Sequence, residues 1–417
     1  MVLKFYNEKE VVVVGGGVAG VAAAVSAARC GVETLLIERY GFLGGTATAS
    51  SVRVFMNFYL KSKPLVGGIM LEVIERLEGL GGYDRRSKVF DPELMKVVLE
   101  DMALESGVKL LYHTEFIDVV MQGNVLRGVV IHNKAGTQLV MSKVVVDATG
   151  DGDVAVAAGC PYKMGRDVDG LTQPMTLIFE LANVKEEFMP SNDVLNSEFE
   201  RVKRSGKLDI PRENVLWFKT PYKGLIFFNT TRIVRVNGTD PDDLTKAEIE
   251  GRRQMLSFVS WLKKTFPKAF GDSYIAKSGP QIGVRETRRI VGEYVLTEDD
   301  VLSAKKFPDT VCRANYPIDI HNPLGEGTVI KHPPRGDYYE IPYRCLVPKS
   351  VENLLVTGRC ISATHEALAA IRIMPTCIGL GQAAGVAAAL SVKLGVRPRY
   401  LSVELLRETL KEQGAIL

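Results

Sequence analysis

The sequence predicts an α/β fold organised around a buried parallel sheet, and three adjacent features near its start predict it. The apolar run Val11–Val14 is typical of a buried parallel strand. A glycine-rich segment, Gly15–Gly20, follows at once and leads into the alanine-rich segment Val21–Cys30. A second apolar run, Glu33–Ile37, ends at the acidic Glu38. Strand, glycine turn, helix and second strand together form the βαβ unit of dinucleotide-binding folds.

Each glycine of the G-x-G-x-x-G pattern has a physical role in this unit. Gly15 permits the tight turn, Gly17 lets the backbone approach a pyrophosphate, and Gly20 allows the helix to pack closely on the strand. The helix, beginning around Val18 and Ala19, presents free N–H groups and a positive dipole end to the phosphates. The pattern therefore predicts a dinucleotide site.

The βαβ unit alone, which ends at Glu38, also fits an NAD site, so the choice between FAD and NAD depends on the residues after it. Glu38 is placed to accept hydrogen bonds from ribose hydroxyls, and its charge disfavours a 2′-phosphate. A second glycine pair just past the acidic strand resembles the loop with which glutathione-reductase-type flavoproteins cover the pyrophosphate and ribityl chain. The cofactor contacts expected from this segment are Arg39, Gly44, Gly45, Thr46 and Thr48.

A later strand supports FAD. Val144–Asp147 is followed by Ala148, Thr149 and Gly150, which resembles the strand and "ATG" turn that return to the dinucleotide in the same superfamily. Residues 108–143 between these elements show short strands separated by turns, the pattern of the β-meander inserted in this fold. The expected cofactor contacts include Ala148, Thr149, Gly150 and, within the meander, Phe116.

The C-terminal part supplies a fourth element. The buried strand Asn353–Val356 leads to Gly358 and Arg359, and a helix is expected to begin near Pro375, Thr376 and Cys377. Proline suits the first turn of a helix, where its missing N–H costs nothing. If that helix points at the flavin, its positive end stabilises the anionic reduced form.

With these elements in place, the chain resembles the FAD-dependent oxidoreductase family, a group within the glutathione-reductase-type flavoproteins. Residues 169–176, 283–289 and 358–376 also resemble this family's own stretches. The resemblance implies non-covalent FAD and a dehydrogenase or oxidase acting on a small metabolite. Arg359 departs from it, because many relatives have aspartate after this glycine. No second G-x-G-x-x-G is present, so electrons are expected from a substrate bound at the flavin or from an electron-transfer partner.

The expected domain organisation is discontinuous. Residues 1–160 and 348–417 are predicted to form the FAD-binding domain, and residues 161–347 an inserted α+β substrate domain. Within the insertion, Gly224–Val236 predicts a strand and Lys246–Phe266 an amphipathic helix. Asn322–Asp337 is expected to form a lid or an irregular wall.

Four residues are candidates for catalysis. His365 is the expected general base, because it lies between the C-terminal strand and helix; a structural histidine is the alternative. Arg372 is expected to hold an anionic substrate group or to compensate reduced flavin, and Arg285 to recognise a carboxylate unless it pairs with Glu286. Tyr339 is expected to line the substrate site. Further candidates are Glu366, Arg288, Arg289, His321, His332, Tyr338, Tyr343 and Arg344.

Composition limits the other functions. The 52 basic and 49 acidic side chains leave a net charge of +3, which gives no electrostatic footprint for nucleic acid. Six cysteines form no CxxC pair and five histidines show no zinc spacing, so neither a metal nor a disulfide framework is expected. An RNA-modifying flavoprotein and a flavin-binding electron-transfer subunit remain the alternatives.

The stretch Pro375–Leu394 is long and apolar and contains a GxxxG pair, Gly381 and Gly385. Glycine and alanine are weakly hydrophobic, so a buried helix is expected here rather than a membrane span. The polar start of the chain leads to the expectation of a cytoplasmic protein. A homo-oligomer is left open.

Overall fold

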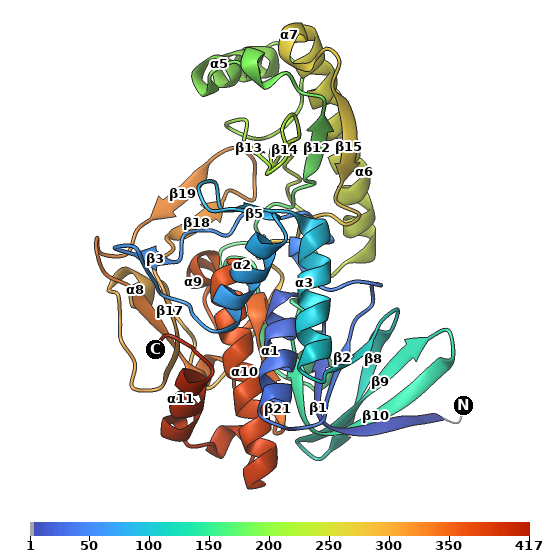
Figure 1. The fold of residues 1–417 in the computed structure, drawn as a ribbon, viewed down its shortest axis with the longest axis vertical. Coiled ribbons are helices and arrows are strands. Elements are labelled where there is room, and N and C mark those ends of the chain that lie inside the picture. Colours follow the sequence, from blue (N-terminus) through green and yellow to red (C-terminus); the bar gives the residue numbers. More distant parts are fainter. Residues whose placement is uncertain (1–3) are drawn as a thin grey trace.

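A seven-stranded, mainly parallel sheet forms the lower half of the molecule in Figure 1. This computed structural model describes residues 4–417. Parallel pairing connects β7, β2, β1, β10 and β21, whereas β9 and β8 continue the sheet antiparallel. The strands are β1 (Lys4–Val14), β2 (Thr34–Ile37), β7 (Lys109–Leu111), β8 (Glu115–Gln122), β9 (Val125–Asn133), β10 (Gly136–Asp147) and β21 (Leu354–Val356).

The centre of this sheet is the apolar run seen in the sequence. Val11–Val14 pairs with Val144–Asp147 on one side and with Thr34–Ile37 on the other. The valines of this run are buried on both faces of the sheet, which is why the run carries no polar alternation. The predicted parallel strands and the antiparallel meander of β8, β9 and β10 are confirmed.

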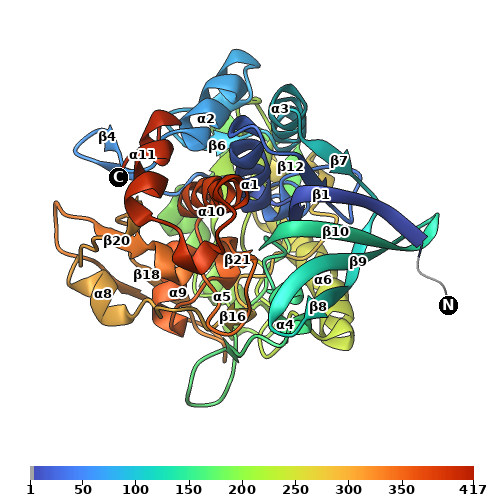
Figure 2. The ribbon, with the colours of Figure 1, turned by 90° about the horizontal axis from the view of Figure 1, so that it is seen from below.

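Two helices pack backbone to backbone over one face of this sheet. Helix α1 (Val18–Arg29) lies against α10 (Met374–Leu394), and Figure 2 shows the two side by side. A Cβ atom at Gly381 would overlap the carbonyl oxygen of Ala19, and one at Gly385 would overlap that of Ala23. The GxxxG pair therefore allows the backbones of α1 and α10 to approach this closely.

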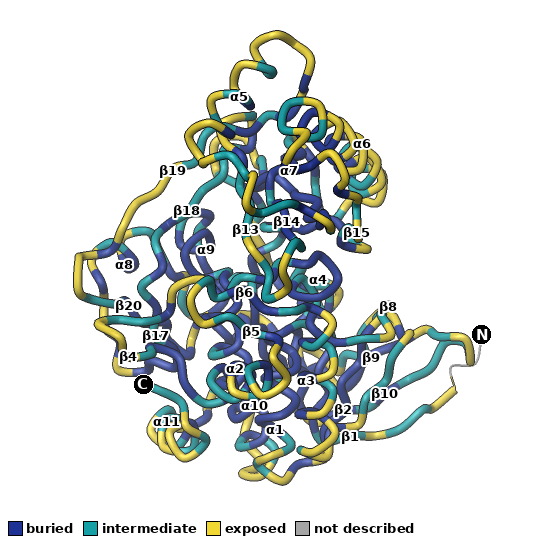
Figure 3. The backbone as a smooth tube through the Cα atoms, turned by 45° about the horizontal axis from the view of Figure 1, so that its top comes forward, coloured by how far each residue is buried: buried dark blue, intermediate teal, exposed yellow. Residues whose placement is uncertain are grey.

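By its length and composition alone, helix α10 could cross a membrane. However, 78% of its most apolar window is buried inside the protein. Figure 3 shows this helix buried along most of its length, with exposed residues toward its C-terminal end. Its apolar surface is accordingly covered by the sheet, by α1 and by neighbouring helices.

Gly385→Ala is expected to lower the free energy of unfolding by about 2–3 kcal/mol, because the added methyl group forces the backbones of α10 and α1 apart. Gly79→Ala is the matched control, since Gly79 is also helical but nothing lies within 4 Å of an added Cβ. There the helix propensity of alanine should leave stability unchanged or raise it by up to about 1 kcal/mol. Urea unfolding midpoints measure both, and equal shifts would contradict this account.

A second, smaller sheet stands above the first in Figure 1 and has its own core. Its strand order is β13-β14-β12-β15. Aromatic rings fill the space between sheet and helices: Phe179 stacks on Phe228, and Phe258 meets both edge-on. The elements are β12 (Phe179–Ala182), α5 (Asn192–Arg204), β13 (Trp217–Lys219), β14 (Ile226–Phe228), α6 (Pro241–Thr265), α7 (Pro267–Phe270) and β15 (Tyr274–Ser278).

Two elements of this part differ from expectation. The strand expected over Gly224–Val236 is reduced to β14, because the hydroxyls of Thr230 and Thr231 exchange hydrogen bonds with the backbone of neighbouring segments. Helix α6 begins before the predicted Lys246, because Asp240 caps it by accepting from the N–H groups of residues 242 and 243.

Residues 290–347 pack with the first core, whereas residues 175–284 form the second. The second core thus lies within the expected insertion of residues 161–347, whose boundaries stay a prediction. Within the expected irregular loop, Asn322–Asp337, strand β19 (Thr328–Lys331) pairs with β18 (Ile318–His321) in a hairpin.

The remaining strands and α-helices lie outside the two large sheets. They are β3 (Tyr59–Leu60), β4 (Lys63–Pro64), α2 (Ile69–Gly79), β5 (Tyr83–Asp84), β6 (Val89–Phe90), α3 (Pro92–Glu105), α4 (Asp153–Ala157), β11 (Tyr162–Met164), β16 (Arg288–Ile290), α8 (Glu298–Leu302), β17 (Thr310–Ala314), β20 (Tyr339–Pro342), α9 (His365–Ile371) and α11 (Val403–Glu412).

Candidate functional site

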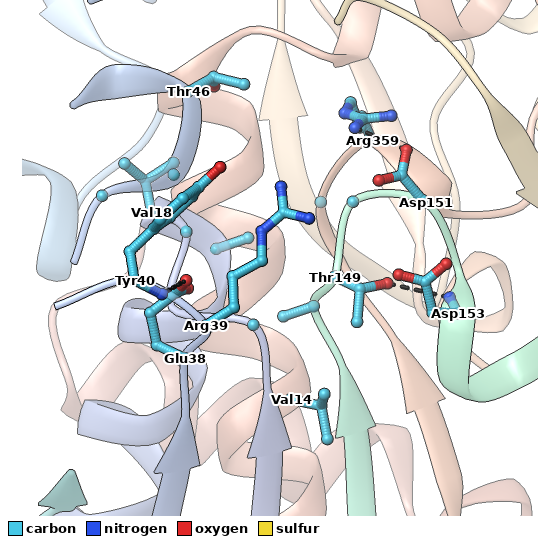
Figure 4. Close-up of a pocket in the computed structure, with 18 of the residues that line it drawn as sticks. Val14, Val18, Glu38, Arg39, Tyr40, Thr46, Thr149, Asp151, Asp153 and Arg359 are labelled. Atoms are coloured by element: carbon cyan, nitrogen blue, oxygen red, sulfur yellow. Dashed lines mark hydrogen bonds and ion pairs between the residues drawn. The ribbon is translucent and has the colours of Figure 1, made fainter. Parts of the chain in front are cut away.

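A cavity lies where the carboxyl ends of β1, β2, β10 and β21 meet, the edge at which open α/β sheets bind ligands. Figure 4 shows Glu38 and Tyr40 on one side of it and Asp151 and Arg359 on the other. The lining residues are Val14, Gly15, Gly17, Val18, Ala19, Ile37, Glu38, Arg39, Tyr40, Gly44, Gly45, Thr46, Ser50, Thr114, Glu115, Phe116, Ala148, Thr149, Gly150, Asp151, Asp153, Gln281, Gly358, Arg359, Arg372, Met374 and Cys377.

The glycine turn after β1 forms the floor of this cavity. Gly15 has φ +100° and its N–H donates to the carbonyl oxygen of Ile37, 2.9 Å away. A Cβ atom on Gly15 would lie 2.5 Å from the carbonyl oxygen of Ala148. A Cβ on Gly20 would overlap the Gly15 carbonyl oxygen, so Gly20 sets the helix packing and does not itself line the cavity.

Helix α1 directs its N-terminus at the cavity. Gly17 occupies the N-cap position without a side-chain cap, and Val18 and Ala19 line the cavity. The first N–H groups of the helix are therefore available to an anion, and the helix dipole adds positive potential there.

Glu38 lies buried at the end of β2, where it lines the cavity. One carboxylate oxygen accepts from the Gly16 N–H at 2.6 Å, and the other accepts from the Tyr40 N–H at 2.9 Å. Burial raises the pKa of Glu38, while these two hydrogen bonds oppose the increase. The backbone thus fixes the carboxylate at the position expected for a ribose contact.

The second glycine pair folds back over the first. The Gly44 N–H donates to the Gly16 carbonyl oxygen at 2.8 Å, and a Cβ on Gly45 would lie 2.9 Å from the Gly17 Cα. Thr46 lines the cavity, but Thr48 is buried and its hydroxyl donates to the Leu43 carbonyl oxygen. Thr48 therefore holds the loop in place and, contrary to expectation, lies away from the cavity.

Asp147, at the end of β10, organises the opposite wall. It is fully buried and accepts from the Thr149 N–H and hydroxyl and from the Ala155 N–H. Burial raises the pKa of Asp147, although all three hydrogen bonds favour its charged form. These bonds fix the turn that carries Thr149 and Gly150 into the cavity.

Arg359 is held in a network of its own. One of its Nη atoms lies 2.7 Å from the Asp151 carboxylate, and the other donates to the Thr287 hydroxyl at 2.8 Å. Thr287 in turn donates to Asp151. The charge of Arg359, where many relatives carry aspartate, is thereby partly neutralised by a carboxylate that also lines the cavity.

Helix α10 begins at the far end of the cavity. Ile373 is its N-cap without a side-chain bond, and Met374 and Cys377 line the cavity, whereas Pro375 and Thr376 do not. A thiol at a helix N-terminus is expected to have a lowered pKa, but burial raises the pKa of Cys377 to about 12. Burial likewise raises the pKa of Cys360 well above its ordinary value, so neither thiol is readily ionised.

The expected base, His365, does not line the cavity. It is 5% exposed, and its Nδ1 lies 2.8 Å from an oxygen of the fully buried Glu286, which also pairs with Arg289. This position is typical of a histidine held for structure, and a catalytic role for His365 stays a prediction.

The other three catalytic candidates differ in where they lie relative to the cavity. Arg372 lines the cavity, as expected. Arg285 lies nearby, with one Nη donating at 2.7 Å to the Pro174 carbonyl oxygen. Tyr339 is fully buried in β20, where its hydroxyl lies 3.0 Å and 3.2 Å from two backbone carbonyl oxygens. It does not line the cavity, and its place in the substrate site stays a prediction.

Several residues that line the cavity were not predicted from the sequence. Gln281 is 241 positions from Tyr40, yet its side-chain oxygen accepts from the Tyr40 hydroxyl and, at 3.0 Å, from Arg39. Asp151 and Asp153 directly follow the predicted Thr149–Gly150 turn and were reachable by extending that motif.

The residues present fit an FAD molecule. An uncapped helix N-terminus faces the cavity, the backbone fixes a buried carboxylate at the end of β2, and a second glycine pair covers the glycine turn. This combination defines a dinucleotide-binding flavoenzyme fold. The model of the FAD-dependent oxidoreductase family matches residues 10–410, and the chain belongs to this family. The protein is an FAD-dependent oxidoreductase.

Two comparisons with known proteins extend this result. The thiamine thiazole synthase of Methanococcus aeolicus is 30% identical over 159 residues, 36% of this chain and 57% of that protein. The same enzyme from Saccharolobus islandicus (strain L.S.2.15) is 32% identical, over 40% of this chain and 64% of its own length. The chain thus spans about three fifths of the length of these relatives.

A solved structure resembles almost the whole chain. It is a geranylgeranyl bacteriochlorophyll reductase-like protein from Thermoplasma acidophilum, with a TM-score of 0.51 and 13% identity. The superposition covers 98% of this chain and 84% of that one. At this identity the likeness shows the fold alone, an α/β architecture with a mainly parallel sheet.

Proposed function

We propose that this enzyme transfers a hydride between a small metabolite and non-covalently bound FAD. The observation that carries the proposal is the composition of one cavity, in which the glycine turn of β1, Arg372 and the N-terminus of α10 all take part. The bound flavin supplies the two-electron chemistry, and the chain supplies binding, orientation and charge.

The chain's own groups divide this work. The α1 N-terminus and the Gly44–Gly45 loop hold the pyrophosphate, and Glu38 holds the ribose of the adenosine half. The uncapped N-terminus of α10 and the guanidinium of Arg372 place positive potential at the other end of the cavity. Positive charge there stabilises negative charge that develops during reduction.

The β-meander between β7 and β10 supports assignment to the glutathione-reductase-type subclass. The alignments to the thiazole synthases cover 36% and 40% of this chain, so their named activity is not carried over. We propose a cytoplasmic location, since α10 is packed inside the protein.

Anaerobic reduction of the flavin tests the proposed reaction. A panel of small alcohols, amines and hydroxy acids is mixed with the FAD-loaded protein, and loss of the visible flavin absorbance is followed with time. At least one compound is expected to bleach the flavin, and Arg372→Met is expected to slow that bleaching by about a hundredfold while FAD stays bound. Bleaching by none of them, with normal bleaching by dithionite, would contradict direct reduction by a metabolite and favour an electron-transfer partner.

A further inference from the structure

Four arginines from four separate segments gather beside the flavin cavity. They are Arg212, Arg232, Arg285 and Arg372, and Arg372 itself lines that cavity. The charges of all four act on His321, so all four lie in the neighbourhood of this ring.

Hydrogen bonds hold this arginine cluster together. The side-chain oxygen of Gln173 accepts from an Nη of Arg372 at 3.2 Å and from the N–H of His321 at 3.3 Å. An Nη of Arg232 lies 3.0 Å from the Nδ1 of His321. Arginine only donates, so this ring nitrogen accepts and the proton is on Nε2, 3.6 Å from a carboxylate oxygen of Asp319.

His321 adds no charge to the arginine cluster. Burial, and then the nearby arginines, lower the pKa of His321 well below its ordinary value, so the ring is neutral. Burial likewise lowers the pKa of Arg285 well below its ordinary value, and Arg372 is the first of the charges that add to this effect. Both pKa shifts therefore reflect burial first and the neighbouring positive charges second.

The acidic groups around the arginine cluster are too few to neutralise it. Glu213 pairs with Arg232 at 3.1 Å, and Asp319 accepts from the Tyr316 hydroxyl at 2.9 Å. Across residues 4–417, no carboxylate lies within 4 Å of the guanidinium nitrogens of Arg212, Arg285 or Arg372. Glu326 also acts on Arg232, but it is paired with Lys203, so the charge of Glu326 is already balanced. Four guanidinium groups therefore face two carboxylates, Glu213 and Asp319, which leaves an excess of positive charge.

Buried donors in the same place have no acceptor. One Nη of Arg212, the side-chain amide nitrogen of Gln173 and the Nε of Arg372 make no hydrogen bond in the described chain. Arg212 is 3% exposed and Gln173 is 1% exposed, so bulk water does not satisfy them. Proteins rarely leave such groups without a partner unless a ligand provides one.

We infer that the arginine cluster binds a small dianion, such as a dicarboxylate, and that Arg212, Arg285 and Arg372 contact it directly. This inference rests on the proposed function, because it identifies the metabolite that exchanges a hydride with the flavin as a small dianion. The forked guanidinium group matches a carboxylate with two parallel hydrogen bonds. Arg232, already paired with Glu213, positions His321 rather than the ligand.

Binding is measured by calorimetry on the FAD-loaded protein at constant ionic strength, with succinate as probe. Acetate and the uncharged succinamide are the comparisons, and inorganic phosphate distinguishes a phosphate site from a dicarboxylate site. Succinate is expected to bind more tightly than acetate and phosphate, and succinamide not at all. Equal binding of succinate and acetate, or tighter binding of phosphate, would overturn the assignment of a dicarboxylate.

Arg212→Met is the decisive variant. It is expected to weaken succinate binding by about thirtyfold or more, because it removes one buried charge from the ion pairs that the ligand forms. Arg201→Met, at an exposed position on α5, is the matched control and should leave the affinity unchanged. An unchanged affinity in Arg212→Met would overturn the inference.

Thermal unfolding separates a binding role from a structural one. Burial lowers the pKa of Arg212 to about 10. Keeping this buried guanidinium charged therefore destabilises the ligand-free protein. Arg212→Met is therefore expected to keep or raise Tm without ligand, and at one succinate concentration the increase in Tm should be much smaller in the variant than in the wild type. A lowered Tm with succinate still protective would overturn the inference. These readouts need no turnover, so they stand even if the flavin fails to bleach with any metabolite.

Discussion

Gly15→Ala is expected to abolish retention of FAD and to lower the free energy of unfolding by about 3–5 kcal/mol. Gly15 has φ +100°, a region that costs an alanine about 1–2 kcal/mol. The added Cβ also lies 2.5 Å from the Ala148 carbonyl oxygen, so the ends of β1 and β10 must separate. That separation moves the glycine turn that is proposed to hold the pyrophosphate. FAD binding is therefore expected to be lost in addition to stability.

Gly136→Ala is the matched control for this change. Gly136 has φ +98°, nearly the same backbone angle, but nothing lies within 4 Å of an added Cβ. It is expected to cost only about 1–2 kcal/mol and to keep FAD. The flavin absorbance per mole of purified protein and the urea midpoint measure both variants. If Gly15→Ala retains as much flavin as Gly136→Ala, the glycine turn is not the pyrophosphate site.

Glu286→Ala is expected to lower the free energy of unfolding by about 3–5 kcal/mol, because it leaves a buried charge without its partner. Glu286 is fully buried and pairs with Arg289, which is 3% exposed. It also accepts from the backbone N–H of Gln173 and contacts His365. One substitution therefore breaks the connection between α9, the segment before β12 and the segment before β16.

Glu198→Ala is the control, since Glu198 and Arg201 have the same i,i+3 spacing at the surface. An exposed pair contributes about 0–1 kcal/mol, so this variant should unfold close to the wild type. Denaturant unfolding measures both changes. A loss of under about 1 kcal/mol in Glu286→Ala would show that the buried network contributes little to stability.

The sequence predicted the parts of the site that are contiguous in the chain. Gly15, Gly17 and Glu38 belong to a single strand–turn–helix–strand unit, whose geometry is set by local backbone requirements and apolar patterning. The turn after β10 and the helix after β21 were predicted for the same reason. Each is a strand end followed by a small-residue turn or a proline start.

The remainder depends on tertiary packing that local patterns do not encode. Tyr339 sits one residue from the half-buried Tyr338, and only the packing of β20 decides which of the two turns inward. The pKa of Cys377 depends on burial, which here outweighs the helix N-terminus. Arg212 and Arg372 are 160 positions apart, and no spacing rule predicts that such positions converge.

The visible absorption spectrum of the purified protein, repeated on the supernatant after acid precipitation, tests the central claim most directly. We expect a yellow protein that releases its FAD into the supernatant, since no histidine lies in the Gly44–Gly45 loop to form a covalent link. A colourless protein that also fails to bind added FAD would contradict it, and the cavity between Glu38 and Arg359 would then belong to a different nucleotide.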